Sequence, residues 1–148
     1  MEACKLPDYQ KVPPEAFEIV RKTRTIALVG ASPKEERPSH RVMKYLLEAG
    51  FEVIPVNPGQ KEILGKKCYP SLSAIPEDKE IDTVVIFRRA DLVPPIVEEA
   101  LARGVKNIWL QEGIVSEEAR RLAEASGARI VMGFCFKKVH QLEEARRA

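Results

Sequence analysis

The chain has 148 residues, of which 45% are hydrophobic and 31% are charged, and its formal net charge is +2. This length suits one core, so we expect residues 1–148 to form a single domain with a leading helix in residues 1–23 packed on it. The small net charge excludes the basic excess of a general nucleic-acid binder, and no apolar stretch is long enough to span a membrane.

The start of the chain and its cysteines indicate the compartment. The first eleven residues carry charges and no apolar run, so we expect no secretory signal and a cytoplasmic location. Cys4, Cys68 and Cys135 form no CxxC pair, and two buried thiols in a reducing compartment are predicted. No metal site is predicted, because His40 and His140 lie far apart. The scarcity of Asn and Gln beside Lys, Arg and Glu favours a thermophilic source.

Strand-like and helix-like segments alternate along most of the chain, which is typical of an α/β protein. We predict a three-layer Rossmann-like fold with a mostly parallel sheet of five to six strands, in the order 3-2-1-4-5-6. Pro55 predicts an irregularity near the end of the second strand. The expected strands are 25–29, 51–56, 67–69 (a short edge strand), 83–87, 107–110 and 129–132. The expected helices are 13–23, one capped by Ser39, 95–103, one capped by Ser116, and 141–147.

The loop Gly30-Ala31-Ser32 ends the first strand, at the point where such sheets bind ligands. The next helix offers free N–H groups and a positive dipole end there, which favours a phosphate. Ser32 or Ser39 would add a hydroxyl, and Gly30 permits close backbone approach. Because a single glycine replaces the full GxGxxG pattern, a plain tight turn is the alternative.

Basic residues follow this loop. Arg37 lies nearest the helix start and is the preferred phosphate partner, since a guanidinium pairs with two phosphate oxygens. Arg41 lies further along the same helix, while Lys34 and Lys44 are predicted to be solvated.

Polar residues also follow three other strands. Asn57-Pro58 stand where NAD-binding folds usually carry an acidic residue, which favours a nucleotide with a ribose phosphate, or else marks a simple turn. Phe87 precedes Arg88-Arg89 and either stacks on an adenine or, as we favour, completes the core. Gln111-Glu112-Gly113 follow the next strand and either contribute to the ligand site or form an ordinary strand-to-helix loop. Because these strand ends share one edge with Gly30, they predict one nucleotide site.

These residues resemble the CoA-binding domain family, in particular its small stand-alone members. The chain is also similar to the N-terminal domain of the succinyl-CoA synthetase alpha subunit. The matching stretches are Val29-Gly30-Ala31-Ser32-Pro33, Arg37-Pro38-Ser39, 53–58, 85–89, 109–113 and 135–140.

The resemblance implies coenzyme A as the ligand. The pyrophosphate would lie at 30–32, the adenosine and its 3′-phosphate between Asn57-Pro58 and Phe87-Arg88, and the pantetheine arm near 111–113. Val139 replaces the glutamate of the family's Cys-x3-Glu-His motif, so Cys135 is expected to be a packed hydrophobe.

No Ser-His-Asp or Cys-His-Asn set can be assembled from the sequence. We expect His40 to lie exposed in a loop and His140 to lie exposed before the terminal helix. The favoured interpretation is therefore a module that binds coenzyme A or an acyl-CoA, with no catalytic residues assigned. The alternative is a nicotinamide nucleotide-dependent oxidoreductase or NAD(P)-binding module. A thioester-processing enzyme, a regulatory protein with an unidentified partner and a homo-oligomer remain open.

Overall fold

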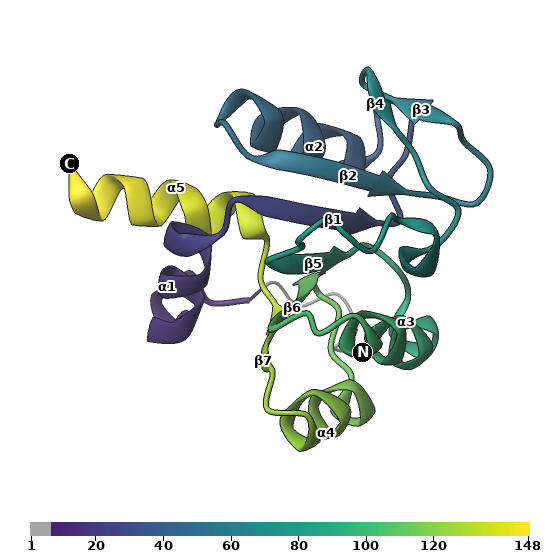
Figure 1. The fold of residues 1–148 in the computed structure, drawn as a ribbon. Helices are drawn as coiled ribbons and strands as arrows, with labels where there is room; N and C mark the ends of the chain where they lie inside the picture. Colours follow the sequence, from purple (N-terminus) through teal and green to yellow (C-terminus); the bar gives the residue numbers. More distant parts are fainter. Residues whose placement is uncertain (1–6) are drawn as a thin grey trace.

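The computed structural model describes residues 7–148, with a five-stranded parallel sheet as the middle of three layers (Figure 1). The strand order is β2-β1-β5-β6-β7, which confirms the Rossmann-like fold. The strands are β1 (Thr25–Val29), β2 (Glu52–Val56), β5 (Thr83–Ile86), β6 (Asn107–Glu112) and β7 (Arg129–Gly133).

The predicted third strand is reduced to one residue. Only Tyr69 pairs with the sheet, through a parallel bridge to Val56, and Pro70 directly after it has no N–H to continue the ladder. The preceding residues form a separate antiparallel hairpin of β3 (Glu62–Ile63) and β4 (Lys66–Lys67). With Tyr69 in the third position, the order 3-2-1-4-5-6 still holds.

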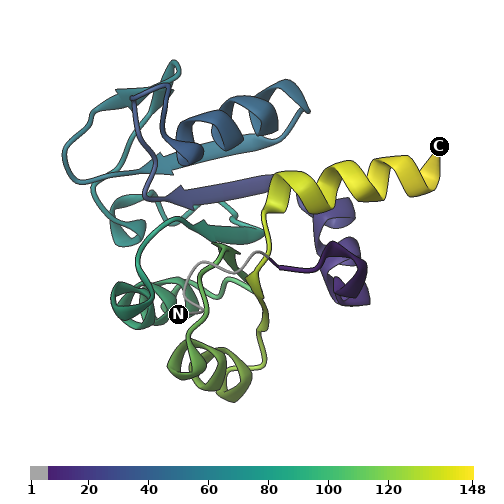
Figure 2. The same cartoon turned by 180° about the vertical axis from the view of Figure 1, so that it is seen from behind.

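Helices cover both faces of the sheet, as the two views show (Figures 1 and 2). Alternate strand residues serve the two cores: Ile26 and Leu28 face one, and Ala27 and Val29 face the other. One layer contains α1 (Pro14–Lys22), α2 (Pro38–Glu48) and α5 (Phe136–Arg147), and the other contains α3 (Val93–Ala102) and α4 (Glu117–Ala125). Three short 3-10 turns, η1 (Tyr9–Lys11), η2 (Leu72–Ala74) and η3 (Ala90–Leu92), complete the elements.

Several helix starts differ from the prediction, including α3, which begins at Val93 and not at residue 95. The N-cap of α2 is Arg37, and Ser39 is the second residue inside the helix, because Pro38 is already suited to the first helical position. The last helix begins at Phe136 instead of Gln141. The predicted cap of α4 is confirmed, since Ser116 Oγ accepts a hydrogen bond from the Ala119 N–H at 3.1 Å.

Pro55 causes no irregularity, contrary to the prediction. The register of β1 with β2 continues through Pro55 to Val56. The N–H of Glu52 donates to Arg24 O at 2.9 Å on the β1 side, so the period of two turns the Pro55 nitrogen toward the outer edge. A proline is tolerated there because no strand needs a donor from it.

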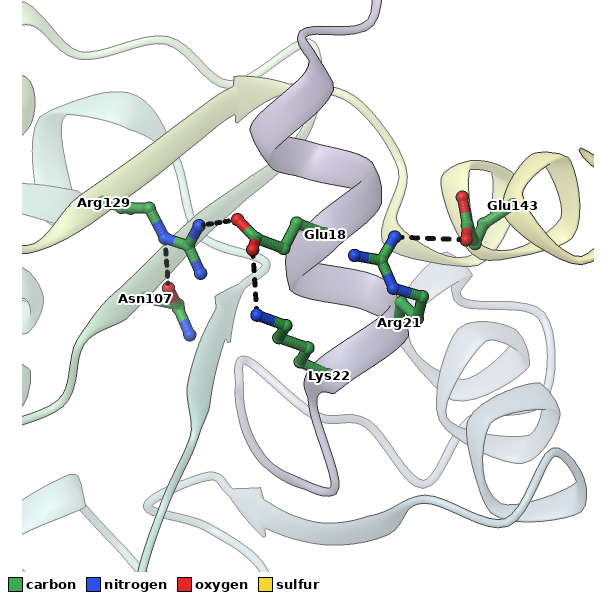
Figure 3. A network of polar contacts seen from close by, with 6 residues as sticks. All are labelled: Glu18, Arg21, Lys22, Asn107, Arg129 and Glu143. Atoms are coloured by element: carbon green, nitrogen blue, oxygen red, sulfur yellow. Dashed lines mark hydrogen bonds and ion pairs between the residues drawn. The ribbon is translucent and has the colours of Figure 1, made fainter. Parts of the chain in front are cut away.

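Helix α1 is fastened to the amino end of the sheet by a polar network (Figure 3). Glu18 accepts hydrogen bonds from Lys22 Nζ at 2.9 Å and from Arg129 Nη1 at 2.6 Å, and Arg129 Nε donates to Asn107 Oδ1 at 3.1 Å. These bonds from Lys22 and Arg129 lower the pKa of Glu18 to about 2. The network therefore joins α1 to the first residues of β6 and β7.

Among residues 7–148, Cys68 and Cys135 are free and buried, as two cysteines were predicted to be; Cys4 lies outside the described residues. No helix in this part of the chain is long and apolar enough to cross a membrane. The same described range holds no group of three His, Cys, Asp or Glu side chains arranged for a metal ion.

Candidate functional site

A groove of about 800 Å³ opens at the carboxyl ends of β1, β2, β5 and β6. The structure brings thirteen of the fourteen predicted site residues to its lining, and Gly113 is the one that does not line it. The thirteen are Gly30, Ala31, Ser32, Pro33, Arg37, Ser39, Asn57, Pro58, Phe87, Arg88, Arg89, Gln111 and Glu112.

Gly30 is required by the fold itself. Its φ is +88°, and a Cβ at this position would lie 2.4 Å from the carbonyl oxygen of Phe87. Its N–H donates to Val56 O at 3.0 Å. The glycine therefore lets the ends of β1, β2 and β5 meet, a structural role in addition to the close ligand approach or tight turn that the sequence predicts.

Asn57 locks the two loops on this side of the groove together. Its Nδ2 donates to Ala31 O at 2.7 Å, and its Oδ1 accepts from the Gly59 N–H at 2.7 Å. An ionised Asp would have no donor for the Ala31 carbonyl. The Asn57 amide therefore has a structural role at this position, because its hydrogen bonds hold the loop after β1.

The start of α2 faces the groove. No side chain caps this helix end, and both Arg37 and Ser39 line the groove, although Ser39 is only 5% exposed. Pro38 has no N–H, and the N–H groups of His40 and Arg41 donate to the carbonyl oxygen before the helix at 3.1 and 3.2 Å. This end therefore offers the Ser39 N–H together with the positive pole of the helix dipole. An anion in the groove would therefore be favoured near Ser39.

His40 is buried inside α2, so the prediction of an exposed loop histidine is wrong. Its Nδ1 lies 2.9 Å from Ser32 O, and since a carbonyl only accepts, Nδ1 carries the proton. The Ser32 hydroxyl accepts from the Lys34 N–H at 3.1 Å. His40 and Lys34 thus hold Ser32 in place from both sides.

Three cations border the groove without an ion pair to any residue in 7–148: Lys34, Arg37 and Arg88. Arg89 differs, because its Nε lies 3.4 Å from Asp91 Oδ1 and its side chain is 76% exposed. The only acidic residue of the lining, Glu112, already pairs with Lys138 at 2.9 Å. The groove therefore carries an excess of positive charge, which suits a phosphorylated ligand.

The wall at β6 and α5 uses its polar groups internally. Gln111 is buried, and its Oε1 accepts from the Phe136 N–H at 2.9 Å, which caps the start of α5. Partial burial alone would raise the pKa of Glu112, but hydrogen bonds from Lys138 and Tyr9 hold that pKa below its usual value. Glu112 is therefore ionised at neutral pH and fixed in place.

His140 also differs from its prediction. It lies inside α5, half-buried, and its Nδ1 is 2.7 Å from the Tyr45 hydroxyl, outside the groove lining. Burial lowers the pKa of His140, and the carboxylate of Glu144 opposes that shift only in part. His140 therefore packs α5 against α2 and does not line the groove.

Some residues of the groove were not predicted as site residues. Lys34 was expected to be solvated, although its place next to Ser32-Pro33 was a usable signal. Cys135 and Val42 come from separate helix regions, which only the packing of α2 against α5 brings together. The additional lining residues are Lys34, Pro38, Val42, Gln60, Ile114 and Cys135.

Comparison with known proteins agrees with this geometry. The CoA binding domain model matches residues 24–141. The uncharacterized protein YneT of Bacillus subtilis is 40% identical over 126 residues, which cover 85% of this chain and 92% of YneT. Acetate–CoA ligase [ADP-forming] I of Archaeoglobus fulgidus is 32% identical over 127 residues, covering 79% of this chain and only 18% of the ligase.

Solved structures give the same result. A hypothetical protein from Pyrococcus horikoshii OT3 superimposes with a TM-score of 0.84 at 42% identity, covering 88% of this chain and 90% of that one. A Thermus thermophilus protein, cell-free ID.343, gives a TM-score of 0.81 at 30% identity, covering 87% and 96%. With the family domain matched over most of its length, the chain belongs to the CoA-binding domain family.

Proposed function

We propose that this protein binds coenzyme A, free or as an acyl thioester, in the groove at the carboxyl end of its sheet. The observation that carries the proposal is the set of three cations around the groove, Lys34, Arg37 and Arg88, with no ion pair to any described residue. Coenzyme A carries a pyrophosphate and a 3′-phosphate, so it supplies the anions that such a set would bind.

The ligand would lie across the strand ends in a defined direction. Its pyrophosphate would meet the loop at 30–32 and the open start of α2 at Ser39. Its adenosine 3′-phosphate would meet Arg88, beside Pro58. The pantetheine arm would then run toward Glu112 and Cys135 on the opposite wall.

The proposal is limited to binding. The ligase of Archaeoglobus fulgidus is named for a reaction, but this chain matches only 18% of that protein. Free buried thiols at Cys68 and Cys135 suit a reducing compartment, so we place the binding function in the cytoplasm. A protein partner that responds to the bound coenzyme A remains a further hypothesis.

Calorimetric titration tests the binding. We expect saturable binding of coenzyme A, with a rise in melting temperature as the ligand is added. NAD and NADP serve as competing ligands, and tighter binding of either one would make a nicotinamide-nucleotide module the better assignment. The absence of both heat and a melting shift with coenzyme A would reject the proposal.

The Arg88→Ala variant tests the placement of the adenosine. Loss of a guanidinium–phosphate contact is expected to weaken coenzyme A by about 10- to 100-fold. The same variant should leave dephospho-coenzyme A, which lacks the 3′-phosphate, close to its affinity for the unaltered protein. Arg89→Ala is the matched control, because the Arg89 guanidinium already pairs with Asp91. Equal losses for the two variants would indicate a general charge effect and overturn the placement.

A further inference from the structure

Tyr9 precedes α1 and lies outside residues 24–141, the part matched by the family domain. Its hydroxyl nevertheless reaches the groove wall and makes two hydrogen bonds there. It donates to Glu112 Oε2 at 2.8 Å and accepts from the Cys135 N–H at 2.8 Å. Glu112 and Cys135 both line the groove, whereas Tyr9 itself does not.

Tyr9 is held firmly enough to fix these two partners. Its ring packs edge-on against Phe134, with centroids 5.3 Å apart, and Lys138 Nζ lies 5.5 Å from the ring centroid. Asp8 caps the short turn that carries Tyr9 by accepting from the Gln10 N–H at 2.9 Å. Burial raises the pKa of Tyr9 well above its usual value, so the hydroxyl keeps the proton that it donates to Glu112.

The two partners of Tyr9 belong to different elements. Glu112 is the last residue of β6, and Cys135 is the N-cap of α5. The Tyr9 hydroxyl joins them, in parallel with the bond from the Phe136 N–H to Gln111. Tyr9 thereby sets the position of the Glu112 carboxylate relative to the start of α5.

The distance of the groove wall formed by Glu112 and Cys135 from Gly30 determines which part of the ligand can reach it. In the strand order, β6 is two strands from β1 and β7 is three, so the wall lies about 10–14 Å from the loop at Gly30. An extended pantetheine arm, with a length close to that of four extended residues, spans about 14 Å. The adenosine and phosphates would stay near Gly30, and only the arm would reach Glu112 and Cys135.

We propose that Tyr9 is a positioning residue for the pantetheine arm: it holds Glu112 and the start of α5 where the arm contacts them. This inference rests on the proposed binding of coenzyme A. It makes a segment outside the family domain part of the binding site, and it predicts that Tyr9 favours ligands that carry the arm over those that lack it.

The test compares Tyr9→Phe with the unaltered protein, using coenzyme A and adenosine 3′,5′-bisphosphate, which lacks the arm. Tyr9→Phe keeps the ring and removes only the hydroxyl. We expect coenzyme A to weaken about 3- to 10-fold and the bisphosphate to change by less than about twofold. Tyr45→Phe is the matched control, since it removes a hydroxyl that bonds His140 outside the groove, and it should change neither ligand.

A double-mutant cycle with Glu112→Gln tests the route through Glu112. The two substitutions together should cost less than the product of their separate effects on coenzyme A, because both disturb one contact. Multiplicative effects would overturn that route. Equal weakening of both ligands by Tyr9→Phe, or no weakening of coenzyme A, would overturn the positioning role. If the unaltered protein binds the bisphosphate but shows no gain from the arm, this inference fails alone; if it binds neither ligand, the proposed function fails as well.

Discussion

The two ends of the sheet differ in whether their charged side chains are paired within the protein. At the amino end, Glu18, Lys22 and Arg129 satisfy one another (Figure 3), and Arg103 donates to carbonyl oxygens at 2.6–3.2 Å in the loop before β5. Arg103 borders a hollow of about 670 Å³ there, and both of its terminal nitrogens, Nη1 and Nη2, are used in these bonds. Paired charges of this kind fasten elements together and leave little to offer a ligand.

At the carboxyl end, Lys34, Arg37 and Arg88 line one groove and have no ion-pair partner within residues 7–148. An anion bound among these like charges would offset their mutual repulsion. The two hollows have similar volumes, about 670 and 800 Å³, so the charges that line them distinguish them better than their size does. Under the proposed function, the cations of the groove without an ion pair are the groups that would hold the ligand's phosphates.

The largest effect on stability is expected at Gly30. Gly30→Ala would place a Cβ 2.4 Å from Phe87 O at a φ of +88°, and we expect a loss of about 2–4 kcal/mol in the free energy of unfolding. Gly113→Ala is the control, because its φ of +82° is similar but its Cβ would meet nothing within 4 Å, and a loss of about 1 kcal/mol is expected. Urea unfolding measures both. Equal losses would show that the approach to Phe87 is not what requires the glycine.

A pair of arginine variants sharpens the contrast between the two ends. Arg129→Ala should lower the melting temperature by about 2–4 °C and leave coenzyme A affinity unchanged, because within residues 7–148 the Arg129 guanidinium bonds only Glu18 and Asn107. Arg37→Ala should weaken coenzyme A by about 3- to 10-fold and leave the ligand-free melting temperature unchanged. Calorimetry and thermal melts separate the two effects. An Arg37→Ala protein that melts as low as Arg129→Ala would contradict the division of roles.

The smallest expected effect is a loss of stability at acid pH. The folded pKa of Glu18, about 2, lies below its ordinary value of 4.5, so its stabilising contribution is complete above pH 4.5 and is lost as the pH falls toward 2. We expect the melting temperature to fall over this window, and Glu18→Gln to flatten part of the fall. An NMR titration of the Glu18 carboxyl should give a midpoint near 2. A midpoint at the ordinary value would show that the network in Figure 3 does not hold in solution.

The strands and their order followed from local patterns. The apolar runs 25–29 and 83–87 predicted buried strands, and alternate residues do face two cores. The predicted length of the third strand is too great, because the residue types of 67–69 suit a strand but only Tyr69 pairs with Val56. The irregularity predicted at Pro55 is wrong because the sequence does not show which side of a strand lacks a neighbour.

By itself, the sequence determined the fold class and the edge of the sheet at which its polar loops gather. Hydrophobic periodicity is local, and the right-handed crossovers of alternating strands and helices then favour one strand order. Tertiary structure alone decided which polar groups remain for a ligand. His40 was placed in a loop but is buried against Ser32, and the hydroxyl of Tyr9 meets Glu112 across 103 positions of sequence. Tyr9 and Glu112 are brought together by how the N-terminal segment packs against the sheet, and no local pattern contains that information.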